Sequence, residues 1–124
     1  MDKVYKLSEK LLSDINTYSE QYTSPDGKEV VSDDSLRDLE LILQAGFTLH
    51  KYMIEKDLWQ NKPTIAQALV DLGKFMEQLQ ITKENAEKLH LSSTLQIWHQ
   101  AKMAIAVLAC NILDWRDGGN EESQ

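Results

Sequence analysis

Apolar residues recur along this chain at spacings of three and four, the period of a helix with one buried face. The pattern predicts one helix over about residues 3–22, a second from 32 or 35 to a point before 61, and a third over about 63–80. Thr82 would cap a short fourth helix, and a long last helix would run from about 93 to 117. The predicted core positions of the first three helices are Val4, Leu11, Ile15, Tyr18, Tyr22, Leu39, Ile42, Gly46, Leu49, Met53, Ile65, Ala68, Leu69, Leu72, Phe75, Met76 and Leu79.

Turn and cap residues support these boundaries. Ser24–Gly27 has the composition of a type I turn, with proline at its second position. Ser35–Asp38 and Ser93–Gln96 each resemble a capping box, in which the serine bonds the first turn of the helix that it opens. Pro63 suits the first turn of a helix, and Gly118 should end the last one because glycine readily adopts left-handed geometry.

The last predicted helix contains the most informative segment, Met103–Cys110, whose eight residues are all apolar. Because this segment spans more than two turns, every face is apolar and it must be covered from all sides. The rest of the domain covers it, or a second copy of the chain completes the cover. Cys110 is then expected to be a small, inert hydrophobe. The residues predicted to form the core of this helix or a homodimer contact are Trp98, Ile105, Val107, Leu108, Ile112 and Trp115.

The sequence therefore predicts an all-α fold. We expect a single-domain antiparallel bundle of four long helices and one short helix, with the C-terminal helix in the centre. Residues 1–119 would form the domain, and residues 120–124 a disordered acidic tail. Gly46 inside the second helix predicts that a neighbouring helix crosses closely there, since glycine otherwise destabilises a helix by about 1 kcal/mol.

Charge and cysteine usage narrow the environment. The chain of 124 residues has a net charge of −7, concentrated in residues 26–40 and 114–124. Such a surface repels phosphate backbones, so nucleic acid is an improbable partner and a basic protein surface a better one. The single cysteine fits a reducing compartment, and neither a signal peptide nor a membrane span is evident. We therefore predict a cytoplasmic protein.

The best candidates for metal ligands are Glu84, Glu87 and His90, which are three residues apart and so lie on one side of a helix. Glu-x-x-His is the ligand pair of di-iron bundle proteins, but those proteins carry it twice. The alternative function is therefore a divalent-metal-binding bundle or hydrolase, and a solvated helix face explains the same residues. The sequence calls for no cofactor and shows no catalytic constellation.

Residues 81–94 resemble a DNA-reading helix-turn-helix, through Ala86, Leu89, Leu91 and a serine cap at Ser92. The resemblance implies a nucleic-acid-binding regulator, which is a second alternative. The turns that would enter the groove, residues 94–100, contain no Lys or Arg.

The leading interpretation is a non-enzymatic, acidic interaction module, such as an inhibitor, an immunity-type protein or an adaptor. Asp33, Asp34 and Asp38 would meet a basic surface on the partner protein and steer the encounter. Trp59, near the end of the second helix, would be the apolar anchor.

Overall fold

The computed structural model describes residues 2–84 and 91–118, and it confirms the all-α prediction. The described residues form four helices and no strand, apart from an isolated bridge between Thr23 and Glu29. The helices are α1 (Asp2–Gln21), α2 (Asp33–Glu55), α3 (Pro63–Glu84) and α4 (Leu91–Arg116). The predicted tail, residues 120–124, lies outside the described residues.

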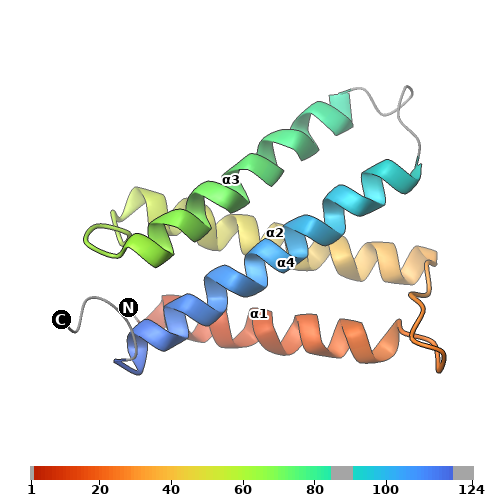
Figure 1. Cartoon of the computed structure of the whole chain (residues 1–124), viewed down its shortest axis with the longest axis horizontal. Helices are drawn as coiled ribbons and strands as arrows, with labels where there is room; N and C mark the ends of the chain where they lie inside the picture. The colour runs from red at the N-terminus through yellow and green to blue at the C-terminus, as the bar shows by residue number, and fades with distance from the viewer. Residues whose placement is uncertain (1, 85–90, 119–124) are drawn as a thin grey trace.

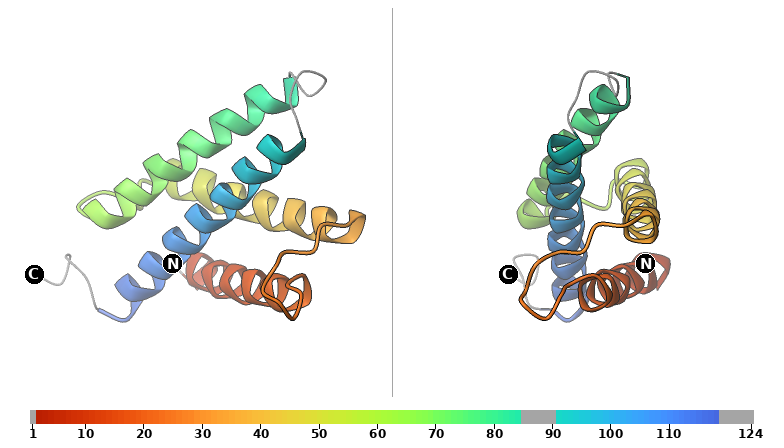
Figure 2. Two further views of the ribbon diagram at one scale, coloured as in Figure 1. Left: turned by 45° about the vertical axis from the view of Figure 1, so that its right-hand side comes forward. Right: turned by 90° about the vertical axis from the view of Figure 1, so that its right-hand side faces the viewer.

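The helices form two antiparallel pairs, α1 with α2 and α3 with α4, and the second pair crosses the first diagonally (Figure 1). Two further views show that α3 and α4 lie together on one side of the bundle, with α2 beside them and α1 below (Figure 2). The C-terminal helix α4 contacts each of the other three helices, as a central helix should, but α2 does so as well.

The termini of α2 and α4 show which local signals decide a helix boundary. Ser32, not Ser35, is the N-cap of α2: the Ser35 amide donates to Ser32 Oγ at 3.1 Å, and the Ser32 amide donates to Ser35 Oγ at 2.8 Å. The box predicted at Ser35–Asp38 is therefore one turn too late, because Ser35 itself closes the box. At the other end of the chain, Gly118 adopts a φ of +76° just after α4, as predicted.

The short helix predicted after Thr82 does not begin there, because α3 continues through Thr82 to Glu84. The run before Glu84 contains no glycine or proline after Gly73, so nothing forces the backbone out of helical geometry. The rest of that predicted helix falls in residues 85–90, outside the described part of the chain. The cap predicted at Ser93 is also wrong, since α4 already begins at Leu91.

The predicted core is largely correct. In α2 every predicted position is buried, and in α4 Ile105, Leu108 and Ile112 are fully buried. The expectation that Met103–Cys110 is covered on all sides is wrong for the single chain. Met103 and Val107 are 62% and 50% exposed, and Cys110 is exposed as well. The reason is geometric: the other three helices approach α4 only from the side that carries Ile105.

Gly46 marks the closest approach of α2 and α4, which confirms the predicted crossing. A Cβ built on Gly46 would lie 2.5 Å from Cγ1 and 2.9 Å from Cγ2 of Ile105. Real Cβ atoms essentially never come this close to another heavy atom. Ile105 is fully buried, so it has no free space into which to turn.

We expect Gly46→Ala to destabilise the fold by about 1–3 kcal/mol, because the added methyl overpacks the α2–α4 crossing. Gly73→Ala in α3 is the matched control: its Cβ would lie 3.5 Å from His50 Nε2, an ordinary contact. At this position the higher helix propensity of alanine should raise the free energy of unfolding by up to about 1 kcal/mol. Urea unfolding of both variants measures the difference, and equal stabilisation by both would contradict the close crossing.

Candidate functional site

The segment that joins α1 to α2, taken together with the first two residues of α2 (residues 22–34), is here called the acidic connection. Its backbone folds back on itself through two hydrogen bonds of 2.7 Å, from the Val30 amide to the Tyr22 carbonyl and from the Ser24 amide to the Lys28 carbonyl. The predicted turn at Ser24–Gly27 is present, with the Gly27 amide donating to the Ser24 carbonyl at 2.8 Å. These bonds give a connection without regular secondary structure a defined shape.

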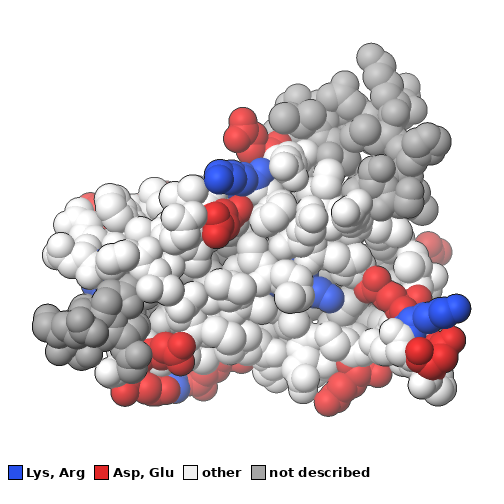
Figure 3. Space-filling view, in the orientation of Figure 1, with Lys and Arg blue, Asp and Glu red and all other residues white. Residues whose placement is uncertain are grey.

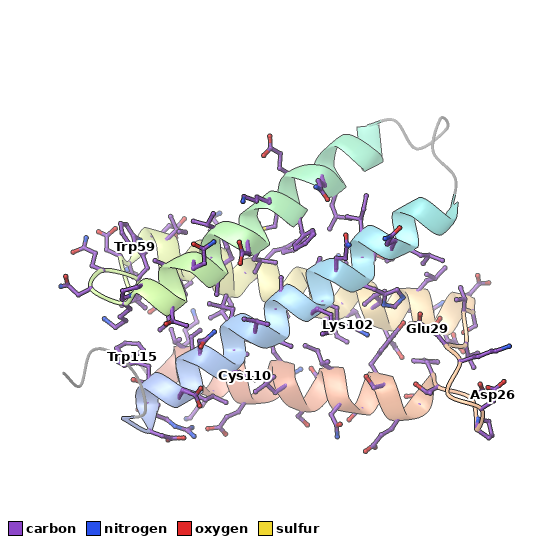
Figure 4. All side chains as sticks on the ribbon, in the orientation of Figure 1. Asp26, Glu29, Trp59, Lys102, Cys110 and Trp115 are labelled. Carbon is purple, nitrogen blue, oxygen red and sulfur yellow. The ribbon has the colours of Figure 1, made fainter. Side chains whose placement is uncertain are left out.

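Glu29 ties this connection to the helices beneath it. Figure 4 labels Glu29 at this end of the molecule. The Glu29 carboxylate accepts a hydrogen bond from Tyr18 Oη of α1 at 3.3 Å and lies 2.9 Å from His99 Nε2 of α4. Lys102 Nζ sits 4.8 Å from the centre of the Tyr18 ring, on the same side of α4. One carboxylate thus links the connection to two helices that are far apart in the sequence.

The environment of Glu29 sets the charge state of its neighbours. Burial lowers the pKa of His99, and the carboxylate of Glu29 offsets this only in part, so His99 is neutral at pH 7 and donates from Nε2. Burial also lowers the pKa of Lys102. Burial, followed by the nearby charge of Glu29, raises the pKa of Tyr18 to about 12, so the phenol stays protonated and donates.

A second anchor joins the two helices that flank the connection. Tyr22 Oη donates to Asp38 Oδ2 at 2.5 Å, and this hydrogen bond is the main reason that the pKa of Tyr22 rises to about 12. Asp38, one of the predicted contact residues, is therefore half-buried and occupied by an internal partner. Its role is to hold α2 against the end of α1 as well as to add negative charge.

What the connection presents to solvent is an apolar centre with acidic flanks. Val30 and Val31 are 43% and 51% exposed, and Asp33 and Asp34 follow them, also exposed, in the first turn of α2. Charged side chains gather at this end of the molecule (Figure 3). The sequence analysis placed Asp33 and Asp34 here but did not include the two valines. Two adjacent valines within a run of charged and polar residues were the signal.

Trp59 lies at the opposite end of α2, between Asp57 and Asn61, two residues with left-handed backbone (φ of +53° and +63°). With a rise of about 1.5 Å per residue, α2 separates Trp59 from the aspartates by roughly 30 Å. The structure therefore does not bring the predicted anchor and the predicted acids into one patch. Trp59 is 37% exposed and lines a separate apolar pocket of about 390 Å³ with Ile54 and Val70.

The outer side of α4 carries a third surface. A groove of about 850 Å³ runs along α4 beside α3, with Phe75, Met103, Ala104 and Val107 among its apolar lining. Glu29 and His99 stand at one edge of it, and Asp71 and Lys74 of α3 at the other. Of the residues predicted for the core or a dimer, only Val107 faces this groove.

The tryptophans of α4 are both half-buried against the core. Trp115 packs edge-on against Tyr5 of α1 with ring centres 5.9 Å apart, and Lys62 Nζ lies 4.4 Å from the centre of the indole. Trp98 packs on the core side of α4, so neither ring is a free interface anchor. His50, by contrast, bonds the Leu69 carbonyl at 2.9 Å, as a boundary histidine should.

The predicted metal ligands cannot be placed as a set. Glu84 ends α3, whereas Glu87 and His90 lie outside the described residues. Within residues 2–84 and 91–118, no three His, Cys, Asp or Glu side chains are grouped as metal ligands would be. The helix-turn-helix resemblance falls largely on the same undescribed stretch, and Ser92, its expected cap, lies inside α4.

Comparison with protein-family models, curated proteins and solved structures finds no match to this chain. Among the helices that the structure describes, none has the length and apolar character needed to cross a membrane. What the protein does must therefore be argued from its surfaces.

The pKa of His99 predicts a specific pH dependence of stability. Because the folded-state pKa lies below the ordinary value of 6.5, the unfolded chain binds the proton more tightly, and stability falls as the pH drops through that value. Glu29, Lys102 and Tyr18 are the charged and titratable groups around it. We expect His99→Gln, which keeps a donor without titrating, to lose less stability than wild type between about pH 7.5 and about pH 5.5.

Urea unfolding at the two pH values tests this. Asp26, whose hydrogen bond from Ser24 lowers its pKa below the ordinary value of 3.8, stays ionised between these two pH values in both proteins. The difference between the two proteins therefore isolates His99, and identical pH dependences would show that its environment is not as described.

Proposed function

We propose that the protein is a non-enzymatic interaction module that binds a basic surface of a partner protein through the acidic connection. It would act as an inhibitor, an immunity-type protein or an adaptor. One observation carries this proposal. Two exposed valines and two exposed aspartates lie on the same connection, and hydrogen bonds to the helices fix the shape of that connection. We place this module in the cytoplasm, because a chain with one cysteine and no disulfide fits a reducing compartment.

Preorganisation is what makes this connection suitable for binding. A flexible loop would lose conformational entropy on binding, which weakens affinity. Here the bridge at Thr23–Glu29, the anchor at Glu29 and the Ser32 cap already fix the backbone in the free protein. Binding through Val30 and Val31 would therefore not be weakened by the entropy cost of ordering the segment.

The distribution of charge supports a basic partner. Asp26, Asp33 and Asp34 flank the valines in the sequence, against one lysine, Lys28. The ion pair between Asp34 and Arg37, at 3.7 Å, is exposed and weak. Exposed carboxylates of this kind accelerate encounter with a positive surface and set the salt dependence of binding. The valines would supply the apolar contact that excludes water at the centre.

The test is quantitative affinity capture from native host extract, with the tagged wild type compared with three variants. We expect Asp33→Lys with Asp34→Lys, and separately Val30→Ser with Val31→Ser, each to weaken capture of the partner by about tenfold. The control, Glu55→Lys with Glu77→Lys, makes the same change in net charge at exposed positions elsewhere and should bind like wild type.

The two site variants differ in how salt affects them. Added salt should weaken wild-type capture and have less effect on the lysine variant, because the steering charges are gone. A partner held equally by all four proteins would place the interface elsewhere. Failure of the wild type to enrich any protein would contradict the proposal as a whole.

A further inference from the structure

Helix α4 has two seams on opposite sides, and only one of them is used within the chain. The inner seam, formed by Ala101, Ile105, Leu108 and Ile112, is fully buried against the other three helices. The outer seam repeats the same alternation of four- and three-residue steps on the far side. Its members are Gln96, Gln100, Met103, Val107, Cys110 and Asp114, and all six are exposed.

Steps of four and three are the repeat with which two helices pair along a shared seam. An exposed seam of this kind does not contribute to the fold of the single chain, since the inner seam already buries α4. The apolar part is central, at Met103 and Val107, with polar residues at both ends of the strip. This is the order of an interface, with an apolar middle and a polar rim.

The charge of the protein points to a second copy as the occupant. Each chain carries a net charge of −7, so two copies associate most readily through a surface with few carboxylates. The sequence contains no acidic residue between Glu87 and Asp114, and Lys102 is the only charged residue between Leu95 and Leu113. The face over α4 is correspondingly almost free of charged side chains (Figure 3).

We propose that two copies of the chain pair through the outer seams of α4 in antiparallel orientation. The centre of the seam lies between Met103 and Val107, so antiparallel pairing sets Met103 against Val107 of the second copy. It also sets Asp114 against Gln96 of that copy, an amide that can donate to the carboxylate. Parallel pairing would instead set Asp114 against Asp114, a repulsive contact between like charges.

The available surface is of the order that such a pair needs. The outer faces of α3 and α4, each about 10 Å wide and about 30 Å long, present roughly 600 Å² in projection. A stable interface buries about 800 Å² of accessible surface on each partner, which is of the same order. The groove beside α4, about 850 Å³, adds space for side chains of the second copy such as Met103.

Sedimentation velocity from about 1 to about 300 μM tests the dimer. We expect wild type to dimerise in this range, and Val107→Asp to raise the Kd by about tenfold or more, because it places a carboxylate in the seam. Val70→Asp is the matched control: Val70 is 52% exposed against 50% for Val107, but it lies on the α2 side of α3. Circular dichroism verifies that both variants are folded.

A cysteine pair tests the orientation. In the antiparallel seam, position 100 faces Cys110 of the second copy, whereas the two native Cys110 residues are about 15 Å apart along the helices. Mild oxidation should therefore link Gln100→Cys into a covalent dimer but leave wild type monomeric on denaturing gels. Gln100→Cys with Cys110→Ala, which removes the facing thiol, should not be linked.

A wild type that stays monomeric throughout the range overturns the proposal, and so does a dimer that Val107→Asp leaves intact. A wild type that is linked through Cys110 alone shows parallel pairing, which also overturns it. These outcomes are independent of partner capture, because positions 100, 107 and 110 do not belong to the acidic connection. The experiments can therefore contradict the dimer and support the partner binding, or support the dimer and contradict the partner binding.

Discussion

The crossing of α2 and α4 sets the distance between the two helix pairs. Gly46 contributes no side chain there, and Ile105 fills the space that a Cβ would need. The close contact places one side of α4 against three helices and buries the seam through Ile105. The same geometry leaves the opposite side of α4 without a neighbouring helix in the chain. The close fit of α4 against Gly46 in the core therefore determines which apolar residues of α4 remain at the surface.

The acidic connection depends on the same packing. Tyr18 of α1 and Tyr22, directly after α1, are core residues, yet their hydroxyls hold Glu29 and Asp38. The ring of each tyrosine is fixed by the apolar core, and the hydroxyl then positions a carboxylate at the edge. His99 adds a bond from α4 to the same carboxylate. The shape of the proposed binding surface is thus coupled to the way α1 packs against α4, even though the connection itself has no regular secondary structure.

Helix periodicity predicted most of the fold, because in amphipathic helices the apolar stripe is the buried stripe. In α2 the stripe from Leu39 to Met53 is entirely buried. Periodicity gave no guidance for Met103–Cys110, where every face is apolar, so which face points outward depends on how many helices surround it. Capping patterns were less reliable, since Ser32 and Ser35 both fit and only the backbone decides between them. The candidate site was half predictable: the aspartates followed from charge, but the exposure of Val30 and Val31 depends on a turn held by tertiary hydrogen bonds.

The first turn of α1 and the last turn of α4 lie at the same end of the molecule, where Glu9 pairs with Arg116 and Tyr5 packs on Trp115 (Figure 1). The acidic connection is at the other end. A fusion domain, fluorophore or surface tether joined near Asp2 or Arg116 is therefore held about one helix length away from Val30 and Val31. Immobilisation through either of these turns would orient the connection toward solution, in the geometry that surface-based binding assays require.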